Sequence, residues 1–465
     1  MAEFTYQQAY NSAVSSNNLY TRNKARWEFL LASFTGGEAY RQGAYLQRYQ
    51  LESDQDYTNR LNNTPLDNQC KSLISLYVSF LFRTSPDRQF GDLENNFIVE
   101  NILADADLDG RSMDAFMRDC ATWAGVFGHC WVAVAQPNVG AVTLADQQAL
   151  GVRPYLSVLT PLSVLDWTWT KQPNGAYSLS YIKYIEEVND SMTVIKQWRA
   201  DIITTTVVDT DKKTATAITE EINGLGRLPF VCVYAERSPV RGLGNSLIED
   251  VAGMQRMIYN ELSEVYDSIR LDTHPSLVTT PDTVVGTGAG SLIHMPENLD
   301  PALKPFVLQF QGGSITAIYE SINNRRKMID AMGNVGSVRA TETSTMSGIA
   351  MATEFQLLNA RLSSIGKNLE LAEEQIWREV ASYLNLNWTG EINYPSDFAL
   401  RNVDNELAQL TTAIDKITDP VKRAWIEQEI MKCIDVEDPR HEIIEQQAVI
   451  DGVPPPDETL MEEES

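Results

Sequence analysis

Three aspartates at alternate positions are the first residues in the chain that could carry chemistry. Asp105, Asp107 and Asp109, with a glycine directly after them, reproduce the first six positions of a calcium-binding loop. Such a loop needs a bidentate glutamate at its twelfth position, and here that position is Phe116. The alternative is a turn that caps a helix beginning at Ser112, and we favour this second interpretation.

Three further motifs are incomplete versions of known catalytic or nucleotide-binding signatures. His441–Glu445 resembles a zinc-protease motif but lacks the second histidine. Gly286–Gly290 has no surrounding βαβ unit, and Gly366–Asn368 lacks the hydroxyl residue of a phosphate-binding loop. We therefore expect no cofactor, no metal and no catalytic site. An enzyme that binds a metal through scattered carboxylates stays open as an alternative.

Charge limits what the protein can bind. The 465 residues include 37 Lys or Arg and 63 Asp or Glu, so the formal net charge is −26. Tight binding of nucleic acid through a broad basic surface is excluded, whereas handling DNA without gripping it is not. Five cysteines without a CxxC pair indicate free thiols in a reducing compartment. The longest apolar run, Leu73–Phe82, is too short to cross a bilayer, so we expect no membrane association.

The most basic run in this acidic chain is Arg325, Arg326 and Lys327, and Arg339 follows shortly after it. A solvated helix face or an ion pair between subunits is the simpler interpretation of these cations. Contact with phosphate groups is the second interpretation, and the sequence leaves both open.

The first half of the chain changes from helical to extended periodicity near residue 129. Apolar residues recur at helical spacing over 67–82 and 112–124. Extended segments follow, and turn signals such as Pro173–Gly175 separate them, which predicts one meandering, mostly antiparallel sheet. The segments are 129–134, 155–159, 164–170, 177–185, 192–199, 202–208 and 228–234.

The second half of the chain is dominated by long amphipathic helices. One runs from about Asn245 to a stop at His274–Pro275, and another covers 312–333. Residues 275–311 between them are β-like and rich in proline and glycine, and 334–347 read as a flexible loop. A very long pattern over 351–384 predicts a rod of roughly 55 Å. The last 31 residues, 435–465, contain eleven carboxylates and one arginine and form a solvated acidic tail.

The order of these parts is distinctive, and specific stretches go with it. The best is Leu228–Phe230 followed by Gly242–Ser246, Ile248–Glu249, Gln255, Asn260 and Ser263–Glu264. The earlier ones are Trp27, Gly36–Gly37, Tyr40, Tyr45–Leu46, Glu52, Tyr57, Arg60, Asn68, Phe80–Arg83, Pro86, Asp109–Gly110, Ser112, Phe116, Gly125 and Gly128. In this order they resemble the portal protein of tailed bacteriophages, over most of the chain.

The resemblance implies an α+β portal fold that forms rings. Its parts are a mixed wing (1–240), a first stem helix (241–273), a clip (274–311) and a second stem helix (312–333). A tunnel loop (334–347), a long wing helix (348–388), a wing return with a short crown (389–434) and the acidic tail (435–465) complete it.

The resemblance also implies a function without catalysis. A ring, usually of twelve copies, occupies one vertex of the virion capsid, and double-stranded DNA passes through its channel during packaging and ejection. The expected partners are a separate terminase motor, a head–tail adaptor and the major capsid or scaffolding protein. The alternatives are another virion structural or scaffolding protein, or the carboxylate–metal enzyme named above.

Three groups of site residues follow from this assignment. We expect Val335, Val338 and Arg339 to form the channel constriction, with Arg325, Arg326 and Lys327 further along the channel. We expect the clip tip at Thr283, Gly286, Gly288 and Gly290 to dock partners. A two-helix projection cannot cover its own apolar stripe, so we expect neighbouring subunits to cover Leu247, Val251, Met254, Ile258 and Leu262.

Overall fold

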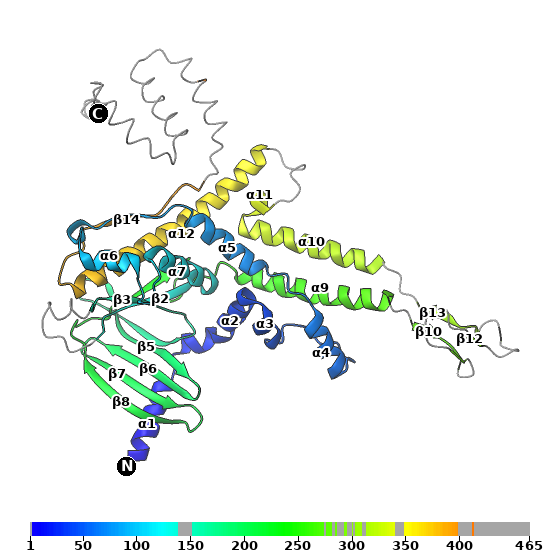
Figure 1. Ribbon diagram of the computed structural model, residues 1–465, viewed down its shortest axis with the longest axis horizontal. Coiled ribbons are helices and arrows are strands. Elements are labelled where there is room, and N and C mark those ends of the chain that lie inside the picture. Colours follow the sequence, from blue (N-terminus) through cyan, green and yellow to red (C-terminus); the bar gives the residue numbers. More distant parts are fainter. Residues whose placement is uncertain are drawn as a thin grey trace. The chain divides into compact units, whose positions relative to one another are not determined.

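The computed structural model describes residues 2–137, 151–273, 276–280, 284–285, 293–294, 300, 303–308, 313–339, 348–398 and 412. The chain divides into two units, residues 1–398 and 399–465, and nearly all described residues belong to the first. That unit mixes helices with antiparallel strands, which confirms the predicted α+β class (Figure 1). The tip residues Thr283, Gly286, Gly288 and Gly290, the segment 340–347 and the acidic tail lie outside the described residues.

Helices make up most of the first 127 residues, and polar caps explain where several of them begin. Asn17, Ser53, Asn68, Asn96 and Ser112 each accept a hydrogen bond from a backbone N–H in the first turn of the helix that follows. The helices are α1 (Ala2–Val14), α2 (Asn18–Thr35), α3 (Gly37–Gln42), α4 (Asp54–Asn63), α5 (Gln69–Leu81), α6 (Phe97–Ala104) and α7 (Met113–Phe127). No helix in the described part of the chain is long and apolar enough to span a membrane.

Two separate sheets replace the single sheet that the sequence predicted. One has the order β3–β2–β9 and the other is a meander in the order β4–β5–β6–β7–β8. The single-sheet prediction is wrong because the chain leaves the first sheet after β3 and returns to it only with β9. The two sheets are in contact through Trp131 of β2, whose ring packs against Trp167 and Trp169 of β4. The strands are β2 (His129–Ala135), β3 (Tyr155–Leu159), β4 (Val164–Lys171), β5 (Tyr177–Asn189), β6 (Met192–Arg199), β7 (Ile202–Asp209), β8 (Thr214–Ile222) and β9 (Phe230–Tyr234).

Two long helices, α9 (Glu249–Thr273) and α10 (Gly313–Gly333), lie side by side and extend away from the sheets (Figure 1). The chain between them contains two strand pairs, β10 (Ser276–Val278) with β13 (Phe306–Leu308) and β11 (Val284–Val285) with β12 (Ile293–His294). After α10, the short helix α11 (Gly336–Arg339) reverses the chain into α12 (Gly348–Tyr383), which has 36 residues. Residues 336–339 are therefore helical, where a flexible loop was predicted. Strand β14 (Glu391–Asn393) finally pairs with β1 (Asp87–Gln89).

A buried carboxylate holds the middle of α12 in the core. The Glu373 side chain is fully buried and accepts a hydrogen bond from Arg88 Nε at 2.6 Å and another from the Tyr394 hydroxyl at 2.6 Å. The indole N–H of Trp377 donates to the same carboxylate at 3.3 Å, and Arg88 also pairs with Asp114 at 2.6 Å. One ion network therefore joins α12 to β1, α7 and the segment after β14.

We expect Arg88→Ala to lower the free energy of unfolding by about 3–5 kcal/mol, because it leaves the carboxylate of Glu373 buried without a cation. The matched control is Arg378→Ala, which removes an exposed arginine paired with partly buried Glu374 on the same helix and should cost about 0–1 kcal/mol. Urea unfolding followed by circular dichroism measures both. If both variants lost the same free energy of unfolding, the buried network would stabilise the fold no more than the pair between Arg378 and Glu374 does.

Candidate functional site

The first half of α9 is buried in the mixed domain, by which we mean α1–α7, the two sheets and α12. Val251 and Ile258 are 2% and 0% exposed within a single chain, and Leu247, just before the helix begins, is 8% exposed. Met254 and Leu262 are partly buried against the same core. The prediction that neighbouring subunits cover this stripe is wrong for Leu247, Val251 and Ile258, because helices α2 and α5 of the same chain already pack along α9.

Polar side chains fix α9 to the mixed domain as firmly as the apolar ones. Gln255 is fully buried, donates to the Ser33 carbonyl at 3.0 Å and accepts from the Cys70 N–H at 2.9 Å. It therefore satisfies one backbone group of α2 and one of α5, which would otherwise be buried without a partner. Gln255, Asn260 and Ser263, all singled out in the sequence, each bind a different part of the mixed domain.

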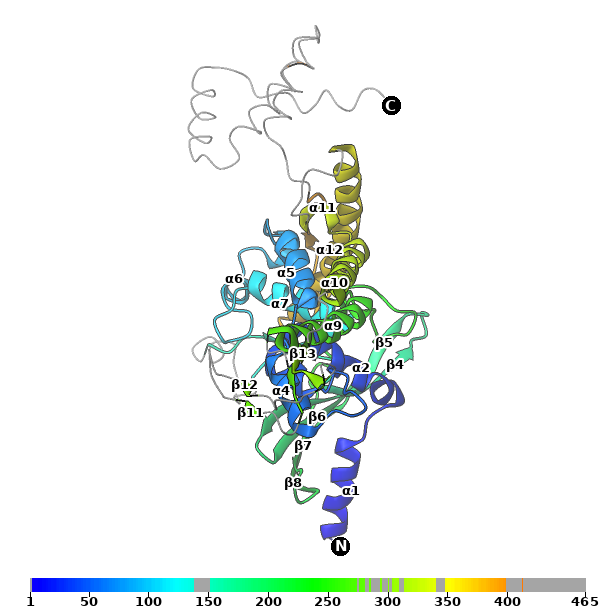
Figure 2. The same ribbon diagram turned by 90° about the vertical axis from the view of Figure 1, so that its right-hand side faces the viewer.

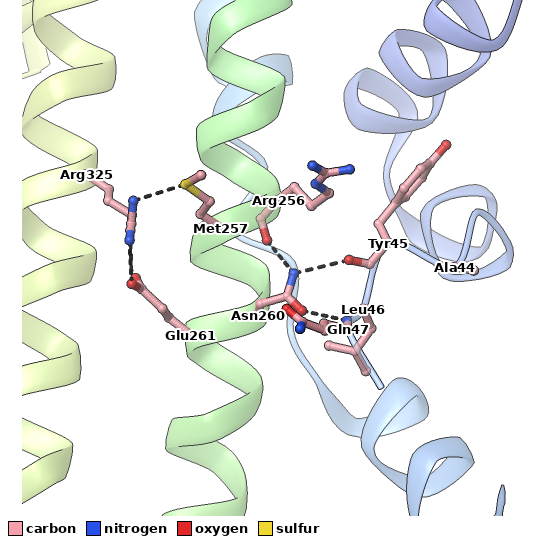
Figure 3. A pocket seen from close by; sticks show the side chains of 9 residues that line it. All are labelled: Ala44, Tyr45, Leu46, Gln47, Arg256, Met257, Asn260, Glu261 and Arg325. Atoms are coloured by element: carbon pink, nitrogen blue, oxygen red, sulfur yellow. Dashed lines mark hydrogen bonds and ion pairs between the residues drawn. The ribbon is translucent and has the colours of Figure 1, made fainter. Parts of the chain in front are cut away.

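A cavity of about 450 Å³ opens beside α9, where the segment after α3 meets the two long helices (Figure 3). Asn260 forms its floor: it accepts from the Gln47 N–H at 2.6 Å and donates to the Tyr45 carbonyl at 3.1 Å. On the other side Arg325 of α10 pairs with Glu261 of α9 at 2.9 Å. The residues that line this open cavity hold three segments together, and they carry no arrangement suited to catalysis.

A buried arginine on α4 completes the attachment of α9. Arg60 is 3% exposed and donates to Ser263 of α9 at 2.8 Å and to the Gln47 carbonyl at 2.6 Å. It also pairs with Glu52 at 2.7 Å, and this hydrogen bond lowers the pKa of the Glu52 carboxyl. Tyr49 covers the guanidinium, with its ring centroid 3.9 Å away. The loop between α3 and α4 is therefore a rigid brace against α9.

The chain enters α9 through a close contact between two glycines. Gly128 has φ +91°, and a Cβ on Gly244 would collide with the Gly128 carbonyl. Beside them His129 is 1% exposed and accepts a hydrogen bond from the Gly244 N–H through Nδ1 at 3.3 Å. Burial lowers the pKa of His129 to about 3, so the imidazole is neutral in the folded protein. The Ser246 hydroxyl donates to the Val126 carbonyl at 2.6 Å and completes the junction.

The basic run on α10 is divided between structural contacts and solvent. Arg325 pairs with Glu261 on α9, and Arg326 pairs with Asp67 ahead of α5 at 2.8 Å. Both arginines therefore act as ion pairs within the chain. Lys327 is exposed and makes no ion pair within the described part of the chain. Of these three cations, only Lys327 has no carboxylate partner within the described residues and could contact another molecule.

The segment after α10 packs inward. Val335 is fully buried, so its side chain belongs to the core and the prediction that it forms a channel constriction is wrong. The physical reason is the turn into α11, which folds Val335 under the end of α10. Arg339 pairs with Asp330 at 2.8 Å and donates to Gln69, and Val338 is partly buried against the core. These contacts hold the start of the predicted tunnel loop against α5 and α10.

The aspartate turn is neutralised by arginines. Asp105 pairs with Arg153 at 3.0 Å, and Asp107 pairs with Arg111. Within the described residues, no group of three or more potential ligands could hold a metal ion. Ser112 caps α7, which confirms the helix-capping interpretation of this turn.

Comparison with known proteins adds only distant similarities of structure. No protein-family model and no curated protein matches the sequence. A structure described as the neck of an empty GTA particle computed with C6 symmetry is 11% identical, with TM-score 0.47, over 84% of this chain and 99% of that one. The virion of a native gene transfer agent (GTA) particle is 10% identical, with TM-score 0.44, over 86% and 98%. At TM-scores below 0.5 these similarities decide neither fold nor function.

Sequence reasoning missed the partners that give the site its rigidity. Nothing in the spacing of Glu52 and Arg60 shows that they pair with each other and that Arg60 also reaches Ser263 of α9. The apolar periodicity predicted α9 correctly, whereas the surface that covers this helix comes from α2 and α5, whose contacts with Gln255 span 222 and 185 residues of sequence. The polar residue Gln255 could have indicated that the same chain covers this helix. A glutamine at a buried helical position needs hydrogen-bond partners, and here backbone groups of α2 and α5 supply them.

His129 predicts how stability depends on pH. Its folded pKa lies below the ordinary value of 6.5, so the stability it contributes is complete above pH 6.5 and falls as the pH drops towards 3. Between pH 7 and pH 5 the free energy of unfolding should fall by about 2 kcal/mol through this residue alone. The variant His129→Gln, measured by urea unfolding at fixed protein concentration, should lose that dependence. The control His294→Gln, at an exposed position, should keep it; a His129→Gln variant with an unchanged slope would contradict the assignment.

Proposed function

We propose that the protein is the portal subunit of a tailed-phage capsid. Copies assemble into a closed ring, twelve of them by the resemblance, at one vertex of the virion, and double-stranded DNA passes through the axial channel. The observation that carries the proposal is the pair α9–α10, which is rooted in the mixed domain by buried contacts and has a small β insertion at its far end (Figure 1). An enzyme would need a set of reactive side chains that converge on a substrate. The side chains around α9 instead hold segments of the chain together.

The charges of the two helices suggest which one faces DNA. Helix α9 carries six carboxylates and two arginines, whereas α10 carries two carboxylates and three cations. A wall formed by α10, with exposed Lys327 on it, would repel phosphates less than a wall formed by α9. The chain as a whole remains acidic, so DNA would slide along the wall without binding it tightly.

The same proposal assigns the partners. The β insertion 274–311 would dock the terminase motor and the head–tail adaptor, and the mixed domain would contact the major capsid or scaffolding protein. Because the chain shows no phosphate-binding loop, the energy for packaging would come from the terminase.

The ring contact of the helical pair should use the apolar side chains that one chain leaves exposed. Tyr266 and Ile269 are 37% and 45% exposed on α9. We expect Tyr266→Asp with Ile269→Asp to give folded monomers in place of rings, because each ring contact would then bury uncompensated carboxylates. Mass photometry and circular dichroism measure the two properties.

Two controls separate assembly from folding. Leu51→Asp changes a fully exposed leucine outside the helical pair and should leave rings intact. Ile258→Asp changes a fully buried residue and should unfold the subunit itself. Intact rings from the Tyr266 and Ile269 variant would show that this face of α9 is not a subunit contact.

The channel assignment makes a prediction for Lys327. Lys327→Glu should leave rings assembled but reduce the DNA packaged or retained per capsid, because it adds like charge to the wall. The defect should shrink as salt increases, since screening weakens contacts between exposed charges and phosphates. Nuclease-protected DNA per particle is the measurement. Lys71→Glu, at another exposed lysine on α5, is the matched control, and equal packaging by both variants would place Lys327 away from the channel.

A further inference from the structure

The five-stranded sheet ends in two strands that pair with no further strand in the described part of the chain, and these strands differ in charge; helix α1 packs against β8 and β7. Its strand order places β4 at one edge and β8 at the other, and Figure 2 shows them on opposite sides of the sheet. Every neighbouring pair in the sheet is antiparallel, so β4 and β8 run in the same direction. The carboxyl ends of both strands therefore lie at the same end of the sheet.

Two cations lie at the carboxyl end of β4, and the loop that contributes one of them carries a third. Lys171 ends the strand opposite Tyr177, and Arg241 lies over the Tyr177 ring, 3.9 Å from its centroid. Arg237, from the same loop as Arg241, lies 5.3 Å from the centroid of the Tyr234 ring. All three cations are exposed, and none of them has an ion-pair partner among the residues that the structure describes.

The loop that presents the two arginines is held in place before any partner arrives. The indole N–H of Trp167 donates to the Arg241 carbonyl at 3.4 Å, and the Gly242 N–H donates to the Tyr234 hydroxyl at 3.1 Å. Gly242 has φ +77°, and a Cβ there would collide with Trp167. A β-bridge at Arg237 closes the loop. Because the guanidinium groups are already ordered on aromatic rings, binding would cost little further entropy.

The opposite edge strand, β8, carries two exposed carboxylates, Glu220 and Glu221, without ion-pair partners among the described residues. Apolar side chains flank them: Ile222 is 87% exposed and Ile218 is 39% exposed. The basic edge has an apolar neighbour of its own, because Val240 is 42% exposed. Each edge thus offers charge together with an uncovered apolar surface.

We propose that these two edges meet in the assembled ring, with the β4 edge of one subunit docked on the β8 edge of the next. This inference rests on the proposed ring. Contacts in a ring are head-to-tail, so one subunit must carry two different, complementary surfaces on opposite sides. Subunits with a net charge of −26 repel one another, so a stable contact needs local charges of opposite sign. The cations of Lys171, Arg237 and Arg241 and the carboxylates of Glu220 and Glu221 supply them.

Charge reversal in the full-length protein tests the contact. Arg237→Glu with Arg241→Glu should lower the ring fraction in mass photometry by about tenfold or more, since like charges then face each other. Glu220→Arg with Glu221→Arg should do the same from the other side. All four substitutions in one chain should restore rings, because the pairing is then reversed but complementary. The control, Arg22→Glu with Lys71→Glu, makes the same change in net charge at exposed residues outside the sheet and should leave rings intact.

Each result has a single meaning. If the wild-type protein forms no rings, the proposed function itself fails. If the wild type forms rings and both reversed variants do as well, only the edge contact is wrong, even if the arginine variant loses affinity for DNA. Failure of the four-substitution chain to recover rings would also overturn the proposal. Recovery excludes misfolding as the cause of the losses in the two parent variants.

Discussion

A fully buried carboxylate in the middle of the longest helix constrains how this chain can fold. A carboxylate in the core needs a cation and hydrogen-bond donors around it, and Arg88, Tyr394 and Trp377 provide them for Glu373. That requirement brings α12 against β1, α7 and the segment after β14. Because α12 is so placed, it packs on β9 and α5 and closes the core to which α9 is attached.

The attachment of α9 bears on how the proposed ring would form. The first half of the helix is covered by its own subunit, with Gln255 and Arg60 satisfying the buried polar groups. The second half leaves that cover and exposes Tyr266 and Ile269. Assembly therefore does not have to fold the helix, and the contacts between subunits can be limited to what one chain leaves free.

The spacing of apolar residues predicted the long helices α9 and α12. The stripes on α9 and α12 repeat every three or four residues over many turns, so each helix was predicted close to its observed position. Strand β8 was missed because its residues are exposed from Thr216 onwards, which leaves no alternation of apolar and polar side chains to detect. Two sheets were read as one because strand order between distant segments leaves no local trace.

What covers each side chain could not be predicted from sequence. Ile258 and Ile269 occupy equivalent positions in one apolar stripe, yet the first is buried in its own subunit and the second is exposed. In the same way Arg325, Arg326 and Lys327 are adjacent, but carboxylates on α9 and ahead of α5 neutralise only the two arginines. Partners contributed by distant segments decide these outcomes, so the roles of these side chains could not be assigned from the sequence.

The central claim is that this subunit builds a ring with an open channel, and electron cryomicroscopy of the purified full-length protein tests it most directly. The account predicts class averages that show a closed ring with a hole on its axis, lined by the α10 helices. Particles of one or two subunits, or a closed disc without an axial opening, would contradict it.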